Sequence, residues 1–240
     1  MKFENTEVWG FKHALRGMRN PLESWNKSDS GCKLYCSVEG VCVEKPCSYD
    51  NCNGCTTTEY IIGKNDLELM QKLIKAGSEH RKFLRQIFVA VDVTAPLYFF
   101  KELDTYKVGT VANSTSTMHK LASTPITIDC FEMDDFEDVE LWECSYDFSK
   151  EKVGLKWENL IETLEFIRQR YNETKDKRYW KELIRLLPES WLQKRTITMN
   201  YENILNMYRQ RKNHKLTEWS KSFCDWVKTL PYAEELICLE

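Results

Sequence analysis

The sequence predicts an α+β fold in which amphipathic helices pack around a buried strand. Apolar residues recur at helical spacing in three segments, at residues 67–74, 160–167 and 219–230. Residues 87–93 (IFVAVDV) are rich in the β-branched and aromatic side chains that favour a buried strand. With 240 residues, 42% of them hydrophobic, the chain is long enough to bury one sizeable core, so we predict a single domain over residues 1–240.

Local signals place the ends of some elements. Residues 5–20 mix large apolar side chains with two arginines, which indicates a strand or turn that leads into a short helix. Asn65 is a suitable N-cap for a helix that starts at Asp66, and Gly77 is a suitable residue to end it. The apolar stripe of the last helix, at 219–230, is typical of a core or an oligomer interface.

Charged residues restrict the location and partners of the protein. Eight acidic residues lie between Asp129 and Glu143, interleaved with apolar ones, and we predict a solvated loop and helix there rather than a metal site. The net charge of −3 argues against broad nucleic-acid binding. No run of 18 apolar residues occurs and the N-terminus lacks a secretory signal pattern, so we expect a cytoplasmic protein without membrane or nucleic-acid partners.

Ten cysteines are distributed unevenly, and six of them define a Cys-rich insertion at residues 31–56 that also contains many turn-forming residues. In a cytoplasmic chain these cysteines are thiols, and thiolates at such spacing can bind zinc. The predicted metal ligands are Cys47, Cys52 and Cys55, completed by one of Cys32, Cys36 or Cys42. The alternative is a surface loop whose cysteines are reduced or partly linked by disulfides. The remaining cysteines lie among apolar residues and are expected in the core: Cys130, Cys144, Cys224 and Cys238.

Residues 198–211 (TMNYENILNMYRQR) place three polar side chains, Asn200, Asn206 and Arg211, in a segment with helical periodicity. Asn200 and Arg211 are about three turns apart at 3.6 residues per turn, so their side chains leave the same face of a helix. An amide and a guanidinium together suit a carboxylate, a phosphate or the polar edge of a nucleobase. We therefore predict a ligand-binding face, and the alternative is a solvated helix face with incidental asparagines.

Residues 95–120 (APLYFFKELDTYKVGTVANSTSTMHK) contain a second polar cluster, which is dense in small hydrogen-bonding side chains. The N-x-x-S spacing of Asn113 and Ser116, taken with the polar residues of 198–211, resembles the flavin-dependent thymidylate synthases. Residues 73–83 (LIKAGSEHRKF) are similar to that family's helix and Gly-His-Glu turn. The Leu-Pro pair at 187–188, the extended segment and the helix that follow are similar to the family's C-terminal layout.

The chain departs from this family at several signature positions. The signature is Arg-His-Arg, two variable residues, Ser, one variable residue, Asn-Glu, one variable residue, Ser, one variable residue and Arg. Aligned on Asn113 and Ser116, the other positions hold Tyr106, Lys107, Val108, Val111, Ser114 and Met118. Candidates to supply the missing positive charge are Lys101, Lys107 and His119. The family's turn histidine is Ser78 here, with His80 two residues on, and a further family arginine would be Ile184, beside Arg185.

The resemblance implies a homotetrameric enzyme with the flavin-dependent thymidylate synthase fold, which methylates dUMP. It implies bound FAD, methylenetetrahydrofolate as one-carbon donor and NADPH as reductant. Arg211 would be the catalytic residue, because it would contact the pyrimidine and stabilise negative charge on its ring. The implied substrate-binding residues are Ser114, Thr115, Ser116, Arg185 and Arg211, and the implied cofactor-binding residues are His80, Lys107, Asn113, Asn200 and Asn206. Two alternatives are an enzyme of this fold that modifies a pyrimidine nucleotide differently and a non-catalytic nucleotide-binding protein.

Overall fold

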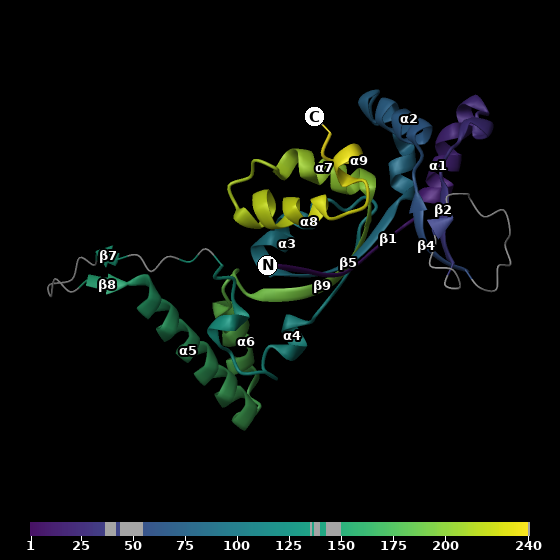
Figure 1. The fold of residues 1–240 in the computed structure, drawn as a ribbon. Helices are drawn as coiled ribbons and strands as arrows, with labels where there is room; N and C mark the ends of the chain where they lie inside the picture. The colour runs from purple at the N-terminus through teal and green to yellow at the C-terminus, as the bar shows by residue number, and fades with distance from the viewer. Residues whose placement is uncertain (37–41, 44–54, 135, 137–139, 143–149, 240) are drawn as a thin grey trace. The chain divides into compact units, whose positions relative to one another are not determined.

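The elements below come from a computed structural model, which describes residues 1–36, 42–43, 55–134, 136, 140–142 and 150–239. At residues 32–36, 42–43, 55–59, 140–142 and 150–155 it describes the backbone alone. The strands are β1 (Lys2–Trp9), β2 (Gly31–Cys36), β3 (Cys42–Val43), β4 (Cys55–Ile61), β5 (Phe88–Pro96), β6 (Val111–Ser114), β7 (Glu140–Trp142), β8 (Lys150–Lys152) and β9 (Leu192–Asn200) (Figure 1). The α-helices are α1 (Phe11–Arg19), α2 (Lys64–Lys75), α3 (Leu97–Leu103), α4 (Thr117–Lys120), α5 (Val153–Thr174), α6 (Lys177–Leu186), α7 (Tyr201–Arg211), α8 (Cys224–Lys228) and α9 (Ala233–Leu236). Shorter helical turns are η1 (Asn20–Leu22), η2 (Trp25–Lys27), η3 (Lys82–Gln86), η4 (Ile128–Cys130) and the π-helix η5 (Glu218–Phe223).

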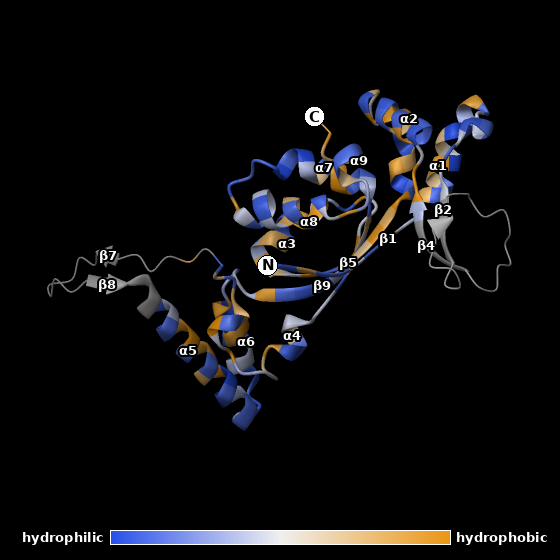
Figure 2. Ribbon diagram, viewed as in Figure 1, coloured by the Kyte–Doolittle hydropathy of each residue, from blue (hydrophilic) through white to orange (hydrophobic). Residues whose placement is uncertain are grey.

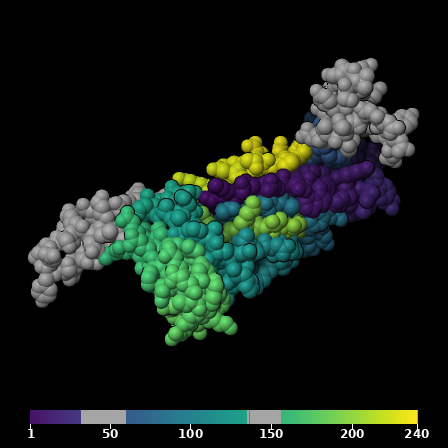
Figure 3. All heavy atoms as spheres, turned by 90° about the horizontal axis from the view of Figure 1, so that it is seen from below, coloured from purple at the N-terminus to yellow at the C-terminus, as the bar shows by residue number. Residues whose placement is uncertain are grey.

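The largest sheet has the strand order β1-β5-β9-β6. The buried strand predicted at 87–93 is confirmed by β5, which begins one residue later, at Phe88, and continues to Pro96. Every second side chain along most of β5 is buried, as expected for a strand with one face on a core. β1 lies at one edge of the sheet and exposes most of its side chains, and it runs along the surface in purple in Figure 3. Helices and antiparallel hairpins together confirm the predicted α+β class.

The chain divides into two compact units, of which unit 1 comprises Met1–Glu4, Asp92–Thr105 and Ala112–Ile197. Its core contains the fully buried Leu164 of α5 and Leu183 of α6, packed with Phe131. The ring of Phe131 lies 5.4 Å from that of Trp157 and 5.5 Å from that of Trp191, measured between ring centroids. Apolar and polar residues alternate along α5 and α6 (Figure 2), as in helices that bury one face.

Unit 2 comprises Asn5–Val91, Tyr106–Val111 and Thr198–Glu240. Its largest fully buried side chains include Tyr201, Trp219 and Phe223. The Tyr201 hydroxyl donates a hydrogen bond to the carbonyl oxygen of Pro231 at 2.7 Å, and burial raises the pKa of Tyr201. The apolar stripe predicted for residues 219–230 is confirmed as core, although the segment begins as the π-helix η5 before α8.

Helix α2 begins at Lys64, two residues before the predicted start, so the prediction that Asn65 is its N-cap is wrong. The N-cap residue is Gly63, and the carboxylate of Asp29 accepts hydrogen bonds from the backbone N–H groups of Asn65 (2.9 Å) and Asp66 (3.1 Å). A residue distant in the sequence therefore satisfies the first N–H groups of the helix. Gly77 follows the helix with a φ of +110°, which agrees with its predicted role as a terminator.

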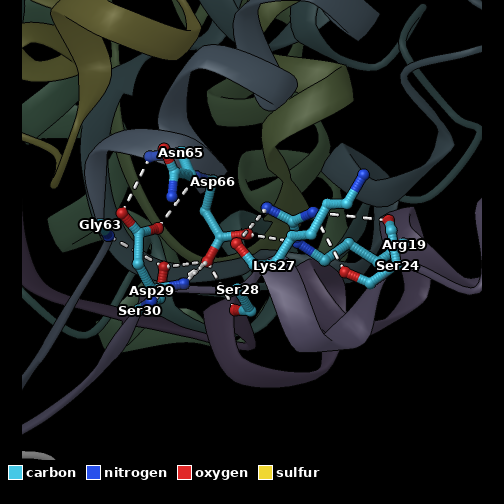
Figure 4. Close-up of polar contacts among 9 residues, drawn as sticks. All are labelled: Arg19, Ser24, Lys27, Ser28, Asp29, Ser30, Gly63, Asn65 and Asp66. Carbon is cyan, nitrogen blue, oxygen red and sulfur yellow. Dashed lines mark hydrogen bonds and ion pairs between the residues drawn. The ribbon is translucent and has the colours of Figure 1, made fainter.

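A buried ion pair joins α1 to α2 and to the turn before β2 (Figure 4). The carboxylate of Asp66 accepts a hydrogen bond from Arg19 Nε at 2.6 Å, and both side chains are buried. The same carboxylate accepts hydrogen bonds from the hydroxyl groups of Ser28 (2.6 Å) and Ser30 (2.5 Å). Gly63, which follows β4, donates its N–H to the Ser30 hydroxyl at 2.9 Å. This network therefore holds both ends of the hairpin that contains the Cys-rich insertion.

The insertion contributes a three-stranded sheet with the order β3-β2-β4. In its register, Cys36 of β2 pairs with Cys55 of β4, and Tyr35 pairs with Cys42 of β3. Cys47 and Cys52, two of the predicted metal ligands, lie outside the described residues. Among the residues described, no cluster of three His, Cys, Asp or Glu side chains has a metal-binding arrangement, so the metal site stays a prediction.

The acidic segment at 129–143 starts in the turn η4, and β7 occupies residues 140–142. We predicted a helix in this segment, and the part of it that the structure describes contains no α-helix. Of the cysteines expected in the core, Cys224 is buried and Cys130 and Cys238 are half-buried, while Cys144 lies outside the described residues. No helix in the described part of the chain is both long and apolar enough to cross a bilayer.

Candidate functional site

The predicted ligand-binding segment forms the end of β9 and helix α7 in unit 2. Asn200 is the N-cap of α7, and its side-chain oxygen accepts the backbone N–H of Asn203 at 3.0 Å. In return, the side-chain oxygen of Asn203 accepts the N–H of Asn200 at 3.2 Å. This reciprocal capping box starts the helix where β9 ends. Asn200 therefore precedes the helix face on which we had placed it, and its oxygen is used to cap the helix.

Asn206 joins a polar network that contains a buried ion pair. Arg81 makes a two-pronged contact with Glu202 of α7, with Nε to Oε2 at 2.9 Å and Nη2 to Oε1 at 3.1 Å. Arg81 Nη2 also donates to the side-chain oxygen of Asn206 at 3.2 Å. Both ionised side chains are buried, so the bidentate geometry offsets part of their desolvation cost. This contact holds the first two turns of α7 against the chain that leads into η3.

Arg211, the predicted catalytic residue, lies beside two aromatic rings at the end of α7, and the centroids of those rings are 6.4 Å apart. Its guanidinium carbon is 5.6 Å from the ring centroid of Tyr106 and 5.1 Å from that of Trp219. Its Nε donates to the Tyr106 hydroxyl at 3.0 Å, and that hydroxyl donates to the side-chain oxygen of Gln210 at 2.8 Å. Cation–π contacts of this kind restrict the orientation of the guanidinium plane. The cluster of Tyr106, Arg211 and Trp219 is called the arginine cluster below.

The loop that starts at Tyr106 follows α7 back to its N-terminus. Asn203 Nδ2 donates to the carbonyl oxygen of Val108 at 2.6 Å. Gly109 has a φ of +81°, and a Cβ atom placed on it would lie 2.8 Å from Nδ2 of Asn200. Glycine therefore meets two requirements here, the left-handed backbone and the close approach to the helix cap. Lys107 and Val108 are exposed, Val108 by 88%.

The remaining predicted site residues of unit 2 include His80, which is exposed and lines a pocket of about 480 Å³. The apolar walls of this pocket are formed by Met18 of α1, Leu69 of α2 and Phe83 of η3, among others. Lys82 and Glu79 also line it and form an ion pair at 3.7 Å. A pocket of this size with apolar walls can accommodate a planar ring.

In unit 1, the predicted nucleotide-binding residues lie at the end of β6 and the start of α4. Two hydrogen bonds hold the backbone of Thr115. Its N–H donates to the carbonyl oxygen of Lys194 at 2.9 Å, and its carbonyl oxygen accepts a hydrogen bond from Gln193 Nε2 at 2.8 Å. Ser116 is the N-cap of α4, with its hydroxyl oxygen accepting the N–H of His119 at 3.2 Å. Asn113 and Ser114 are exposed on β6. Arg185 is exposed on α6 and pairs with Glu182.

The structure thus places Asn206 and Arg211 on α7 and Asn200 at its N-cap, and gives each different protein partners. Sequence reasoning missed Tyr106, Trp219 and the Arg81–Glu202 pair. The one available signal was the position of Tyr106 in the eroded signature, where an aromatic residue replaces an arginine. We interpreted that replacement only as a lost cation, and in the structure it is a new contact to Arg211.

Comparisons with known proteins bear on the fold. No protein-family model and no curated protein matches the chain. The structure is similar to that of the flavin-dependent thymidylate synthase ThyX from Helicobacter pylori complexed with FAD and dUMP, with a TM-score of 0.63, 14% identity and coverage of 100% of both chains. A second structure of that enzyme with FAD and dUMP gives a TM-score of 0.62 at 13% identity, covering 99% of this chain and 97% of that one. A UMP/dUMP methylase, PolB from Streptomyces cacaoi, bound with 5-Br dUMP, gives 0.51 at 14% identity, covering 73% of this chain and 81% of that one. The chain therefore has the flavin-dependent thymidylate synthase fold, as the sequence resemblance predicted.

Proposed function

We propose that this protein is a pyrimidine-nucleotide-modifying enzyme that uses the flavin-dependent thymidylate synthase fold, with dUMP as its substrate. In its specific form, the proposal is the reductive methylation of dUMP to dTMP, with methylenetetrahydrofolate as one-carbon donor and NADPH as reductant. The observation that carries the proposal is Arg211, which the resemblance assigns to the pyrimidine and which the structure places in an aromatic cluster at the end of α7.

The arginine cluster suits this role because the guanidinium is ordered before any ligand arrives. Tyr106 and Trp219 contact the guanidinium through their rings, and Tyr106 also accepts a hydrogen bond from it, so less side-chain entropy is lost when a nucleotide binds. A positive charge near the pyrimidine ring would stabilise negative charge that develops there during methylation. The Arg81–Glu202 pair supports this arrangement, because it fixes the helix from which Arg211 projects.

FAD is the proposed cofactor, and part of the predicted residue set fits it. His80 and Lys107 are exposed, and the pocket beside His80 has apolar walls that suit an aromatic ring. The two charged residues of its lining, Lys82 and Glu79, pair with each other at 3.7 Å, so it is the apolar walls that support FAD at this pocket. Asn200 and Asn206 have protein partners, so in this proposal they support α7 rather than the flavin. Bound FAD would supply the redox chemistry, while the chain binds and orients the nucleotide.

The proposed assembly is a homotetramer, and this prediction is open to a direct measurement. Light scattering coupled to size-exclusion chromatography should give four times the 28.5 kDa mass of one chain. A monomeric mass that does not change with added dUMP and FAD would contradict it.

The test of the proposed function is dUMP binding by titration calorimetry with a matched pair of variants. Arg211→Ala should weaken dUMP binding by about tenfold to a hundredfold, the value of a lost charge-assisted contact. Arg209→Ala is the control, because Arg209 has the same charge, lies in the same last turn of α7 and is exposed. Equal affinity in wild type and Arg211→Ala would refute the assignment of Arg211.

Turnover separates an enzyme from a binding protein. Protein supplied with dUMP, methylenetetrahydrofolate, FAD and NADPH should form dTMP, detected by mass spectrometry, and Arg211→Ala should not. Binding of dUMP that depends on Arg211, without dTMP or another modified nucleotide, would instead indicate a non-catalytic nucleotide-binding protein. The replacement of signature cations by Tyr106 and Val108 is the feature that favours this second outcome.

A further inference from the structure

We propose that unit 1 contains a second ligand site, which binds a planar aromatic molecule carrying an anionic group, such as a nucleotide. The site is a hollow of about 330 Å³, called the α4–α6 hollow, lined by Met118, His119, Ala122, Tyr171, Lys177 and Trp180. The proposal rests on this lining and does not depend on the function proposed for Arg211.

The chemistry of the lining determines the class of ligand. Tyr171 and Trp180 supply two aromatic rings, and Met118 supplies a flexible thioether that packs well against aromatic surfaces. His119 and Lys177 supply nitrogen donors, and none of the lining residues is acidic. An aromatic ring can stack on such walls while its phosphate or carboxylate meets the two basic side chains.

The charges around the hollow also favour an anion. Residues 170–181 carry five basic residues and two acidic ones. Both acidic side chains already have partners, since Glu173 accepts from Arg170 at 2.9 Å and Asp176 accepts from Arg178 at 2.6 Å. This segment therefore carries a formal charge of +3, five basic minus two acidic residues, although the whole chain has a net charge of −3.

Hydrogen bonds behind the hollow keep its walls in place. The indole N–H of Trp180 on α6 donates to the carbonyl oxygen of Met118 on α4 at 3.0 Å. The carbonyl oxygen of Ala122 accepts Arg168 Nη1 at 3.1 Å and Asn172 Nδ2 at 2.8 Å, both from α5. Three helices are thus joined around the hollow, so a ligand would meet a preformed site and would order few side chains on binding.

The test uses a site-specific signal, the methyl resonance of Met118, in protein labelled with 13C at the methionine methyl groups. Met118 lines the hollow and is 47% exposed, and the fully buried Met70 on α2 serves as an internal reference. Addition of UMP should shift the Met118 methyl resonance in a saturable way, because an aromatic ring stacked nearby changes its magnetic environment. Inorganic phosphate, which lacks the ring, and uridine, which lacks the anion, should each bind at least about tenfold more weakly.

Matched variants establish that the signal comes from the proposed contacts. Lys177→Glu should weaken UMP binding about tenfold or more, while Lys181→Glu, the same charge reversal on the same helix but outside the lining, should change it less than about threefold. Tyr171→Leu should weaken UMP binding through loss of the ring and leave phosphate binding unchanged. Arg211→Ala should leave the Met118 response unchanged, which separates this site from the proposed dUMP site.

Three outcomes would overturn the proposal. The first is a Met118 resonance that does not respond to UMP up to millimolar concentration. The second is an equal loss of affinity in Lys177→Glu and Lys181→Glu, which would indicate general charge attraction. The third is a response abolished by Arg211→Ala, which would mean that the hollow is part of a single nucleotide site.

Discussion

Replacement of Asp66 by asparagine should destabilise the protein by about 3–5 kcal/mol, the cost of removing one charge of a buried pair. Asp66 is fully buried and its partner Arg19 is only 4% exposed, so the guanidinium would be left in the interior without a counter-charge. The asparagine would also present an N–H₂ group to the hydroxyl and backbone donors of Ser28, Asp29 and Ser30. Natural domains are stable by about 5–15 kcal/mol, so this loss would be a large share of the total.

Urea unfolding followed by far-UV circular dichroism measures the effect. With m-values of about 3 kcal/mol/M or less, the midpoint should fall by at least about 1 M relative to wild type. Glu68→Gln is the matched control, because Glu68 lies on the same helix and its ion pair with Lys64, at 3.9 Å, is exposed. That variant should lose less than about 0.5 kcal/mol. An Asp66→Asn protein within 1 kcal/mol of wild type would refute the reasoning, since it would show that Arg19 is stabilised without the carboxylate.

The same carboxylate makes a prediction about acid. Burial alone would raise the pKa of Asp66, but the hydroxyls of Ser28 and Ser30 and the guanidinium of Arg19 outweigh it and hold the pKa below the usual 3.8. The stability that this shift contributes is therefore fully present above pH 3.8 and is lost as the pH falls through the lower pKa of the folded state. The stability difference between wild type and Asp66→Asn should narrow over that acid range. A constant difference at all pH values would contradict the assigned shift.

Further perturbations test other parts of the structure. Gly109→Ala should destabilise the protein by about 1–2 kcal/mol more than Gly77→Ala in thermal unfolding. Both glycines have a positive φ, but of the two only Gly109 would place an added Cβ atom within 3 Å of another atom. Equal losses of stability would show that the α7 cap moves to accommodate the extra atom. Arg168 holds the pKa of Glu165 at about 2, so Arg168→Met should move it back toward 4.5 in an NMR titration of the carboxyl group, and no movement would assign the shift to other donors. If the Cys-rich insertion binds a metal, elemental analysis should find about one Zn or Fe per chain, and Cys52→Ser should release the metal. A metal-free preparation in which all six thiols of the insertion react freely would show that the insertion is an ordinary surface loop.

The fold was predictable where a single segment carries its own signal. β5 was predictable because a run of β-branched and aromatic residues is unfavourable in a solvated loop. The apolar stripe at 219–230 was predictable because its spacing matches one buried helix face. The order of the strands in the sheet was not readable, since it depends on pairings between segments far apart in the sequence. The start of α2 was missed for the same reason, because the groups that satisfy its first N–H groups belong to Asp29.

The candidate site shows a similar division. Arg211 was chosen as a candidate site residue from its spacing and from the family resemblance, both of which are local patterns, and its role stays a prediction. Its partners were not predictable, because Tyr106 lies 105 residues earlier in the chain and meets it only in the folded state. Asn200 was placed on a helix face because periodicity does not distinguish the first helical residue from the cap before it.

The loop from Tyr106 to Thr110 has a consequence for how this protein could change over evolutionary time. Its backbone is held by Asn203 and by the close approach of Gly109 to the helix cap, while Lys107 and Val108 are exposed. Side chains at 107 and 108 can therefore be exchanged with little effect on the packing of α7. A family signature can disappear at such positions while the scaffold persists, and new specificity can arise there by single substitutions.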